Sequence, residues 1–424
     1  MPGLDPGIHV LQHGVARENR RNGTMHEAYV PYGVYWSTPF SRWQGGLAHL
    51  HSMEFLAHTA RGELERRGVA LDEIDYGVLG LTVAQKQCFF GLPWVTGMMG
   101  AGHIPGPTIN HACATGARCL QAASQEVEGG GAEVALAMSG DRTSNGPHIY
   151  YPAPHAPGGT GEHENWVLGN FSDDPYAKCG MIDTAETVAR KWQITTGEQH
   201  DVVLRRYEQY EDAVADDRAF QKRYMTLPLD VPDARYRKTA GVLEGDEGIH
   251  ETTREGLDRL RPVADDGTVT YAGQTHPADG NAGFVVTGRE RARAMSQDAG
   301  ISIRLAGFGT ARAEVRHMPE APIGAARRAL DDAGIALDDV AAIKTHNPFA
   351  VNDVVFCRET GADVDAMNNY GCSLIWGHPQ GPTGMRAVIE LIEELALRGG
   401  GRGLFTGCAA GDSAMAVVVE VGDG

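Results

Sequence analysis

The chain contains two copies of one sequence pattern, and this internal repeat limits the folds that it can adopt. LERRGVALDEI at 64–74 matches LDDAGIALDDV at 330–340. TGARCLQAASQEVEGGG at 115–131 matches TGMRAVIELIEELALRGGG at 383–401, at nearly the same spacing along the chain. Two independent matches at almost one spacing indicate a duplicated structural unit.

Each copy combines an amphipathic helix, a glycine-rich stop and an apolar strand. The strands read YGVLGL and AAIKT in the first pair of matches, and EVALAMSG and GLFTGC in the second pair. Strands that alternate with helices favour mostly parallel sheets covered by helices. The residues therefore predict an α/β protein with two related halves.

The pattern divides the chain into four segments. We expect a loosely ordered extension over 1–24, a first half over 25–150 and a second half over 286–424. An inserted loop domain over 151–285 separates the halves, and its end is expected to return to the first half. It begins in irregular, proline- and glycine-rich sequence and continues with a long helical pattern. An insertion of this size between two halves typically shapes a binding site.

Charge and cysteine content exclude several classes of function. The formal net charge of −18 disfavours nucleic acid and anionic membrane surfaces, since both require a basic face. No stretch approaches the roughly 18 uninterrupted apolar residues of a membrane span. The 7 cysteines form no CxxC pair and their number is odd, which favours reduced thiols and a cytoplasmic location.

Four residues with reactive side chains lie where predicted strands end or helices begin. Cys113 precedes the helix of the first copy, and His378 stands at the equivalent place in the second copy. His346 follows the strand AAIKT, and Cys408 follows GLFTG. A single His or Cys in such a place is more often structural, but reactive groups gather at these ends of α/β units. A helix N-terminus also lowers a thiol pKa, and a nucleophile with two acid/base groups is the minimum for covalent acyl transfer.

Seven motifs resemble those of the thiolases, and they follow the order and spacing of that family over most of the chain. The GHPxGxxGxR motif and the C-terminal cysteine loop are the most specific of them. The motifs are NHACATG at 110–116, SGDRTSNGP at 139–147, MIDTAETVA at 181–189, LRP with DGTVTYAG at 260–273, HNPFA at 346–350, GHPQGPTGMR at 377–386 and GCAAGDSAMA at 407–416.

This resemblance implies a fold and an activity. The fold is a duplicated thiolase fold, layered α-β-α-β-α, with two mostly parallel mixed sheets and an inserted loop domain that binds substrate and CoA. The activity is CoA-dependent acyl transfer: reversible thiolytic cleavage of a 3-oxoacyl-CoA, or Claisen condensation, through an acyl-cysteine intermediate. The coenzyme A thioester is a substrate, so no cofactor and no metal ligands are predicted.

The resemblance also implies a role for each reactive residue. Cys113 attacks the thioester substrate, His378 accepts the thiol proton, and Cys408 exchanges protons with the substrate carbon or the CoA thiol. The backbone N–H groups of Cys113 and Ala410 would bind the oxyanion. Many thiolases carry, at the position of His346, an asparagine that holds the catalytic water. A histidine at this position resembles the sterol-carrier and archaeal branches of the family.

Four further residues are predicted to line the substrate and CoA channel. Met181 and Phe349 occupy positions that usually line the acyl and pantetheine channel. His276 and Trp376 depart from the usual pattern of small residues. Together these departures are as consistent with a bulkier acyl chain, branched or aromatic, as with acetyl.

The resemblance extends to assembly, and two other functions remain open. Thiolases form dimers or tetramers, and relatives with His at position 346 work beside a small OB-fold and zinc-ribbon protein, which would be a separate chain. One alternative is a ketoacyl synthase-like condensing enzyme, which Cys408 disfavours. The other is a catalytically silent, CoA-binding subunit, which the intact Cys113, His378 and Cys408 disfavour.

Overall fold

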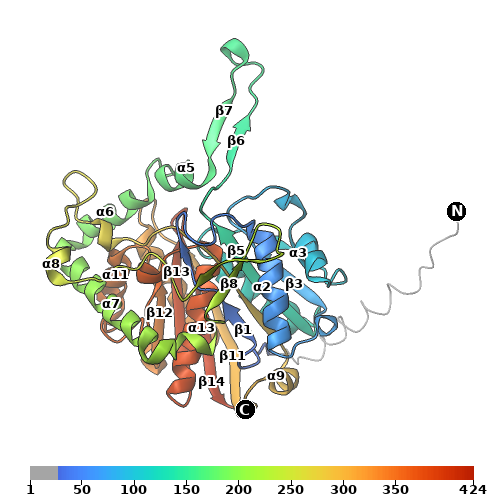
Figure 1. Cartoon of the computed structure of the whole chain (residues 1–424). Coiled ribbons are helices and arrows are strands. Elements are labelled where there is room, and N and C mark those ends of the chain that lie inside the picture. The colour runs from blue at the N-terminus through green and yellow to red at the C-terminus, as the bar shows by residue number, and fades with distance from the viewer. Residues whose placement is uncertain (1–26) are drawn as a thin grey trace.

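The computed structural model describes residues 27–424, which form two β-sheets with helices around and between them (Figure 1). The sheet of the first half has the strand order β1-β10-β5-β3-β4, with β2 beside β10. Its strands are β1 (Tyr35–Ser37), β2 (Ser41–Arg42), β3 (Tyr76–Gly80), β4 (Thr108–Ile109), β5 (Val134–Arg142) and β10 (Ala278–Thr287). The second sheet has the order β11-β14-β13-β12, formed by β11 (Ile301–Arg312), β12 (Ala342–His346), β13 (Gly401–Ala409) and β14 (Ser413–Asp423). The extension predicted over 1–24 lies outside the described residues.

The two sheets confirm the predicted α/β class, but they are mixed rather than mostly parallel. Strand β3 pairs in parallel with β4 and β5, and β12 pairs in parallel with β13. The remaining pairs, which involve β10 and β14, are antiparallel. The prediction of mostly parallel sheets was wrong because β13 returns directly into β14 as a hairpin, and because β10 enters the first sheet only after the inserted region.

The sequence repeat corresponds to a structural repeat. In the first half, helix α2 (Ser52–Arg66) leads through the 3-10 turn η1 (Leu71–Glu73) into β3. In the second half, α10 (Ala321–Ala333) leads through η7 (Leu337–Asp339) into β12. The second repeated stretch forms α4 (Thr115–Glu128) before β5 and α13 (Gly381–Leu397) before β13. The repeat therefore gives each half one helix whose N-terminus follows a candidate catalytic residue.

Helices α4 and α13 pack against each other in the middle of the molecule. At their N-termini a Cβ atom on Gly116 would lie 2.4 Å from the Gly381 carbonyl oxygen. A Cβ on Gly381 would lie 2.3 Å from Ser139 Oγ and 2.9 Å from an Asp141 carboxylate oxygen. Only glycine permits so close an approach of the two backbones.

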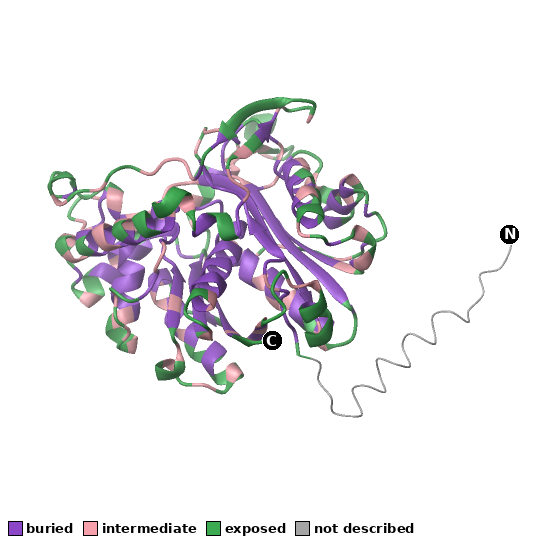
Figure 2. Cartoon of the chain, turned by 60° about the horizontal axis from the view of Figure 1, so that its bottom comes forward, coloured by how far each residue is buried: buried purple, intermediate pink, exposed green. Residues whose placement is uncertain are grey.

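The inserted region lies on one side of both sheets and sends out a two-stranded hairpin (Figure 1). The hairpin, β6 (His148–Tyr151) and β7 (Glu162–Asn165), is mostly exposed, whereas the long central strands are buried (Figure 2). The other elements of this region are α5 (Trp166–Ser172), α6 (Met181–Trp192), α7 (Thr196–Arg218), β8 (Leu229–Pro232), β9 (Thr239–Leu243) and α8 (Arg254–Leu257). Its end returns to the first half as β10, while the domain boundaries themselves stay a prediction.

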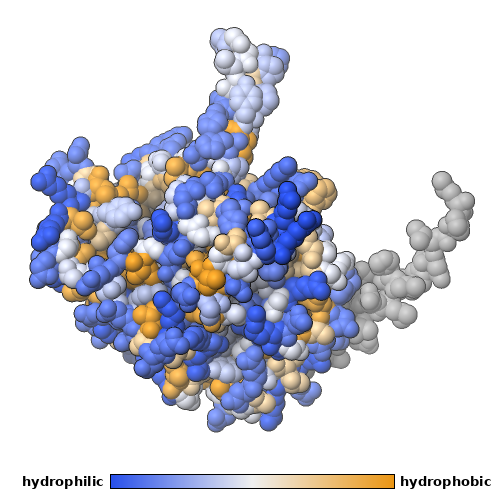
Figure 3. Space-filling model, viewed as in Figure 1, coloured by the Kyte–Doolittle hydropathy of each residue, from blue (hydrophilic) through white to orange (hydrophobic). Residues whose placement is uncertain are grey.

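Shorter elements complete the two halves. The remaining helices are α3 (Leu92–Met99), α9 (Arg289–Met295), α11 (Ala350–Thr360) and α12 (Ser373–Trp376). Further 3-10 turns are η2 (Cys88–Phe90), η3 (Pro157–Gly159), η4 (Gln221–Arg223), η5 (Tyr271–Gly273) and η6 (Met318–Glu320). No helix among residues 27–424 is long and apolar enough to cross a membrane. On the face shown in Figure 3, apolar side chains are scattered among hydrophilic ones.

Buried charges join the inserted region to α13. Arg386 of α13 is fully buried and donates to Asp246 of the inserted region at 2.6 Å and to Glu390 at 3.0 Å. Glu390 also accepts from Lys344 of β12 at 3.0 Å and from Tyr224 at 2.8 Å. Removing one member would leave a buried charge unpaired, which is strongly unfavourable. The network therefore fixes α13 relative to the loops that cover it.

Candidate active site

Cys113 lies in a tight turn between β4 and α4. The turn holds Ala112 at a φ of 42°, a left-handed conformation that is rare for residues other than glycine. Two side chains stabilise it: Thr115 Oγ1 accepts from His111 N and donates to the Ala112 carbonyl, both at 2.7 Å, and Asn110 Oδ1 accepts from Ala112 N at 2.9 Å. Strained residues of this kind cluster at functional sites.

The two candidate histidines come from the second half and meet Cys113. His346 ends β12, His378 precedes α13, and their rings stack with centroids 4.1 Å apart. One ring nitrogen of each histidine and the Cys113 sulfur all lie within 4.8 Å of one another. Cys113 and His378, which occupy equivalent places in the two copies, therefore lie next to each other in the structure.

Each imidazole is held through its other nitrogen. His346 Nδ1 lies 2.7 Å from Ser373 Oγ, and His378 Nδ1 lies 2.7 Å from Thr383 Oγ1. Within the described part of the chain, neither Nε2 has a hydrogen-bond partner, although both are buried. A hydroxyl on Nδ1 fixes the ring orientation and leaves Nε2 available to the site.

Cys408 lies beside this cluster at the end of β13. Its neighbour Gly407 pairs with His346 in the parallel ladder, so the strand register places the cysteine next to the histidine strand. Asn352, in the first turn of α11, donates to the Cys408 sulfur at 3.3 Å. The thiol is fully buried, and both burial and the nearby Cys113 raise its pKa.

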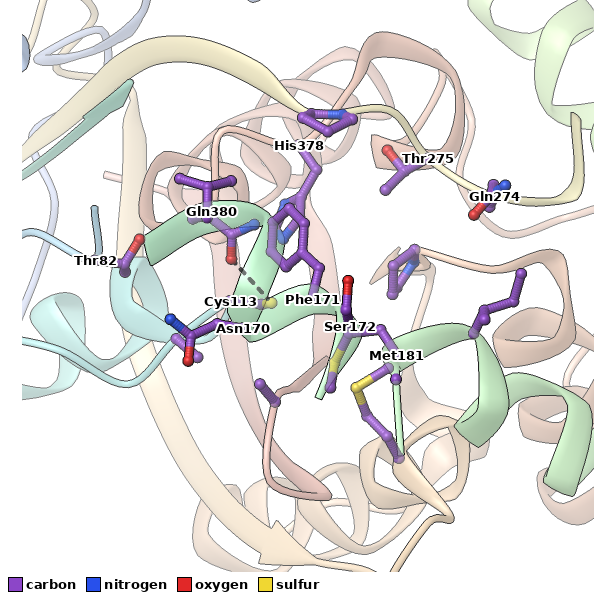
Figure 4. A pocket seen from close by; sticks show the side chains of 18 of the residues that line it. Thr82, Cys113, Asn170, Phe171, Ser172, Met181, Gln274, Thr275, His378 and Gln380 are labelled. Carbon is purple, nitrogen blue, oxygen red and sulfur yellow. Dashed lines mark hydrogen bonds between the residues drawn. The ribbon is translucent and has the colours of Figure 1, made fainter. Parts of the chain in front are cut away.

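Gln380 is a site residue that the sequence did not reveal. The Cys113 thiol donates to Gln380 Oε1 at 3.3 Å (Figure 4). Gln380 precedes α13 with a φ of 66°, so its side chain reaches back to α4. Its buried Nε2 has no partner among residues 27–424 and remains available to a ligand. The sequence feature that could have identified Gln380 was its place between Pro379 and Gly381 in the GHPQG motif.

Asp141 is a second residue that only the structure places at the site. Its carboxylate accepts from the backbone N–H groups of Thr82 and Val83, both at 2.9 Å, and from Gly381 N at 3.0 Å. Burial raises its pKa to about 6, although these donors oppose the shift. Asp141 therefore joins the loop after β3 to the N-terminus of α13.

Burial controls the protonation of the catalytic cluster. It raises the pKa of Cys113 to about 11, although the backbone N–H groups of Ala410 and Cys113 itself act in the opposite direction. Burial lowers the pKa of His346 to about 3, and burial together with His346 holds the pKa of His378 well below 6.5. The expectation that the helix N-terminus lowers the Cys113 pKa was wrong, because desolvation of the sulfur outweighs the backbone donors.

Thiol and imidazoles are consequently all neutral at neutral pH. The backbone N–H groups of Cys113 and Ala410 lie close enough to the sulfur to favour its charged form. A thiolate at Cys113 would therefore be stabilised by two backbone donors, although burial keeps the resting group a thiol.

The cluster opens into a cavity of about 740 Å³. Cys113, His378, Gln380 and Ala410 line this cavity, and Met181 and Phe349 line it too, in agreement with their predicted positions. Its lining also includes the apolar and aromatic side chains Val83, Trp166, Val167 and Phe171. A cavity of this size accommodates a substrate larger than a few atoms.

Two of the predicted channel residues do not line this cavity. His276 lines only a neighbouring cavity of about 700 Å³, whereas Gln274, Thr275 and Pro277 line both cavities. Trp376 is fully buried: it packs against Phe40 with centroids 5.3 Å apart, and Arg386 lies 4.3 Å from its ring. Trp376 therefore belongs to the packing around the buried charges.

Comparisons with known proteins identify this architecture. Residues 36–290 match the family model described as "Thiolase, N-terminal domain", and residues 300–421 match "Thiolase, C-terminal domain". The chain therefore belongs to the thiolase family, and the predicted class of CoA-dependent acyltransferase is confirmed.

Curated relatives align over nearly their whole length. An acetyl-CoA acetyltransferase of Paracoccus denitrificans is 29% identical over 401 residues, covering 90% of this chain and 97% of the relative. Steroid 3-ketoacyl-CoA thiolase FadA6 of Mycobacterium tuberculosis is 27% identical over 421 residues, covering 95% of this chain and 96% of that relative. Among solved structures, the Bacillus anthracis acetyl-CoA acetyltransferase superposes with a TM-score of 0.84 at 25% identity, covering 94% of this chain and 99% of that one.

The protonation state of Cys113 predicts how its alkylation depends on pH. Because its pKa is about 11, the thiolate fraction in the free enzyme should rise about tenfold per pH unit between about pH 7 and about pH 9. The rate of iodoacetamide labelling at Cys113, followed by peptide mass spectrometry, should rise in the same proportion. A rate that is constant over this range would show a preformed thiolate–imidazolium pair and contradict the neutral site.

Proposed function

We propose that this thiolase cleaves and forms 3-oxoacyl-CoA thioesters through an acyl intermediate on Cys113. The observation that carries the proposal is the meeting of Cys113 Sγ with one ring nitrogen each of His346 and His378 within 4.8 Å, beside a cavity of about 740 Å³. A thiol, a base and preorganised donors in one buried site are what covalent acyl transfer requires.

In the first half-reaction, the Cys113 thiol transfers its proton to His378 Nε2 and its sulfur attacks the 3-oxo carbon of the substrate. The N–H groups of Cys113 and Ala410 bind the oxyanion that forms there. The bond between C2 and C3 then breaks, and Cys408 donates its proton to C2. The products are acetyl-CoA and acyl-Cys113.

In the second half-reaction, the Cys408 thiolate takes the proton of a free CoA thiol. The CoA sulfur attacks the acyl carbon and displaces Cys113, which recovers its proton from His378. His346 Nε2 accepts a hydrogen bond from a water molecule. The second hydrogen of this water donates to the thioester oxygen, and so does the N–H that His378 has gained. Each proton that leaves a side chain is therefore returned within one cycle.

The channel residues support a path for the CoA arm. Gln274 forms a β-bridge with Phe349, and Thr275 N donates to the Pro348 carbonyl at 2.7 Å. Gln274 and Thr275 line the cavity together with Met181 and Phe349. We assign this group of lining residues to the pantetheine arm. Homo-oligomeric assembly, a small OB-fold and zinc-ribbon partner and a cytoplasmic location stay predictions.

The apolar and aromatic lining of the cavity supports a bulky acyl chain. Its side chains include Val83, Trp166 and Phe171, and Trp166 is held by a 3.0 Å hydrogen bond from its Nε1 to the Thr82 carbonyl. One relative, which is 27% identical to this chain, is named a steroid 3-ketoacyl-CoA thiolase, and a steroid is a bulky group. We therefore propose an acyl group larger than acetyl.

The roles of the two cysteines predict different effects on the two half-reactions. In Cys408→Ala, acylation of Cys113 by an acyl-CoA should persist, because the departing CoA thiolate is stable without the Cys408 proton, while thiolysis falls about 10²–10⁴-fold because the proton donor to the C2 carbanion is lost. Acylation is measured by intact mass, and thiolysis by loss of the 3-oxoacyl-CoA enolate absorbance. Cys88→Ala, a cysteine that does not line the cavity, serves as the control.

Equal loss of both half-reactions in Cys408→Ala would show that the acid/base role is misassigned. Wild-type protein that binds CoA without becoming acylated would support the silent-subunit alternative. A ketoacyl synthase-like enzyme would retain carbon–carbon bond formation in this variant.

The proposed substrate class predicts an order of specificity constants. With 3-oxoacyl-CoAs of increasing bulk, kcat/KM should rise above the value for acetoacetyl-CoA, because each buried CH₂ contributes about 0.8 kcal/mol. Phe171→Ala should alter kcat/KM for bulky substrates more than for acetoacetyl-CoA. A preference for acetoacetyl-CoA over all larger substrates would contradict the assignment.

A further inference from the structure

The catalytic cluster has a donor set that the acyl-transfer chemistry does not fully explain. His346 Nε2 and His378 Nε2 are both buried and lack partners within residues 27–424, and one ring nitrogen of each histidine lies within 4.8 Å of Cys113 Sγ. The exposed fractions of the two histidines are 1% and 5%. One sulfur and two imidazole nitrogens form a set that Zn²⁺ prefers, and three protein ligands with one open position are typical of accessible zinc sites.

The second nitrogen of each imidazole is held as it is in metal sites. A metal-bound histidine usually donates its other ring N–H to an oxygen, which fixes the tautomer and the ring orientation. Ser373 Oγ donates to Asn347 Oδ1 at 3.2 Å and can therefore accept from His346 Nδ1 at 2.7 Å. Thr383 Oγ1 occupies the same place for His378 Nδ1, also at 2.7 Å. Both arrangements leave the Nε2 lone pair directed into the site.

The geometry leaves room for a fourth ligand. Zinc bonds of about 2.0–2.3 Å bring tetrahedral ligand atoms to within roughly 3.3–3.8 Å of each other, so the three atoms need to approach by on the order of 1 Å. Cys113 and His378 both line the 740 Å³ cavity, and the fourth position can face it. Water or the thiol of a bound CoA can occupy that position.

We propose that Cys113 Sγ, His346 Nε2 and His378 Nε2 form an inhibitory site for Zn²⁺ and similar borderline-soft divalent cations. Coordination replaces the S–H bond of Cys113 by an S–metal bond, and the proton passes to solvent without any change of oxidation state. A metal-bound sulfur is no longer available to attack a thioester. This inhibition rests on the proposed function, whereas the binding itself rests on the geometry alone.

A second pair of histidines provides the control for binding elsewhere. His148 and His163 stack on the exposed β6-β7 hairpin, with Nδ1 and Nε2 2.9 Å apart. This pair offers two nitrogens and no thiol, so it is a weaker site for zinc. Replacing it leaves the catalytic cluster intact.

The test measures metal binding separately from activity. The full chain is titrated with Zn²⁺ by calorimetry and with Co²⁺ by absorption spectroscopy. We expect one tightly bound metal per chain, with the thiolate-to-cobalt charge-transfer band of a tetrahedral site. Cys113→Ala should weaken binding by at least about 100-fold and abolish that band, since even the loss of a residue that only hydrogen-bonds to a metal ligand costs about 10–100-fold. The double variant H148A/H163A should bind as the wild type does.

Competition and inhibition complete the test. Prior alkylation of Cys113 with iodoacetamide should prevent metal binding, and Zn²⁺ should slow acylation of Cys113 in proportion to occupancy. Equal zinc affinity in wild type and Cys113→Ala, or loss of the tight site in H148A/H163A, would overturn the proposed site. If zinc binds through Cys113 but acyl transfer continues unchanged, the proposed catalytic role of Cys113 fails and the metal site stands.

Discussion

The close approach of the N-termini of α4 and α13 is the contact on which the rest of the site depends. A Cβ at position 116 would lie 2.4 Å from the Gly381 carbonyl oxygen, so the backbones meet at a distance that only glycine allows. Cys113 precedes one helix and His378 precedes the other. Because the two halves are copies of one unit, one packing contact brings a thiol and an imidazole together from residues far apart in the chain.

Around this contact the protein creates a buried site whose groups are neutral at rest. Burial raises the pKa of Cys113 to about 11 and lowers that of His346 to about 3. In the proposed reaction the N–H groups of Cys113 and Ala410 stabilise negative charge where it develops. Two imidazole nitrogens are buried without partners among residues 27–424, and this is why we propose that the cluster also binds a soft metal ion.

The sequence predicted the features that depend on local pattern. The repeat predicted the paired helices and strands, and the motifs predicted the residues at their ends, including Met181 and Phe349 beside the cavity. It did not predict the antiparallel pairing of β10 and β14, because strand direction depends on how the chain returns to a sheet. It also misplaced Trp376, whose neighbour Arg386 belongs to a charge network that no linear motif displays.

Gln380 and Asp141 show the same limit at the level of chemistry. Each contacts the site through a residue more than 200 positions away: Gln380 reaches Cys113, and Asp141 reaches Gly381. The raised pKa of the Cys113 thiol was likewise not evident, since helix position alone favours a thiolate, whereas burial opposes it. Desolvation and long-range contacts are tertiary properties, and they decide the behaviour of residues that the sequence identified.

The most direct measurement of the central claim is the rate of Cys113 acylation in Gly116→Ala, compared with Gly62→Ala. A Cβ at position 116 would meet the backbone of α13, whereas one at position 62 has no atom within 4 Å among the described residues. A displacement of about 1 Å between reacting groups costs about 100-fold in rate. The account predicts that acylation falls to that extent in Gly116→Ala, with circular dichroism unchanged and Gly62→Ala unaffected. Wild-type acylation in Gly116→Ala would contradict it.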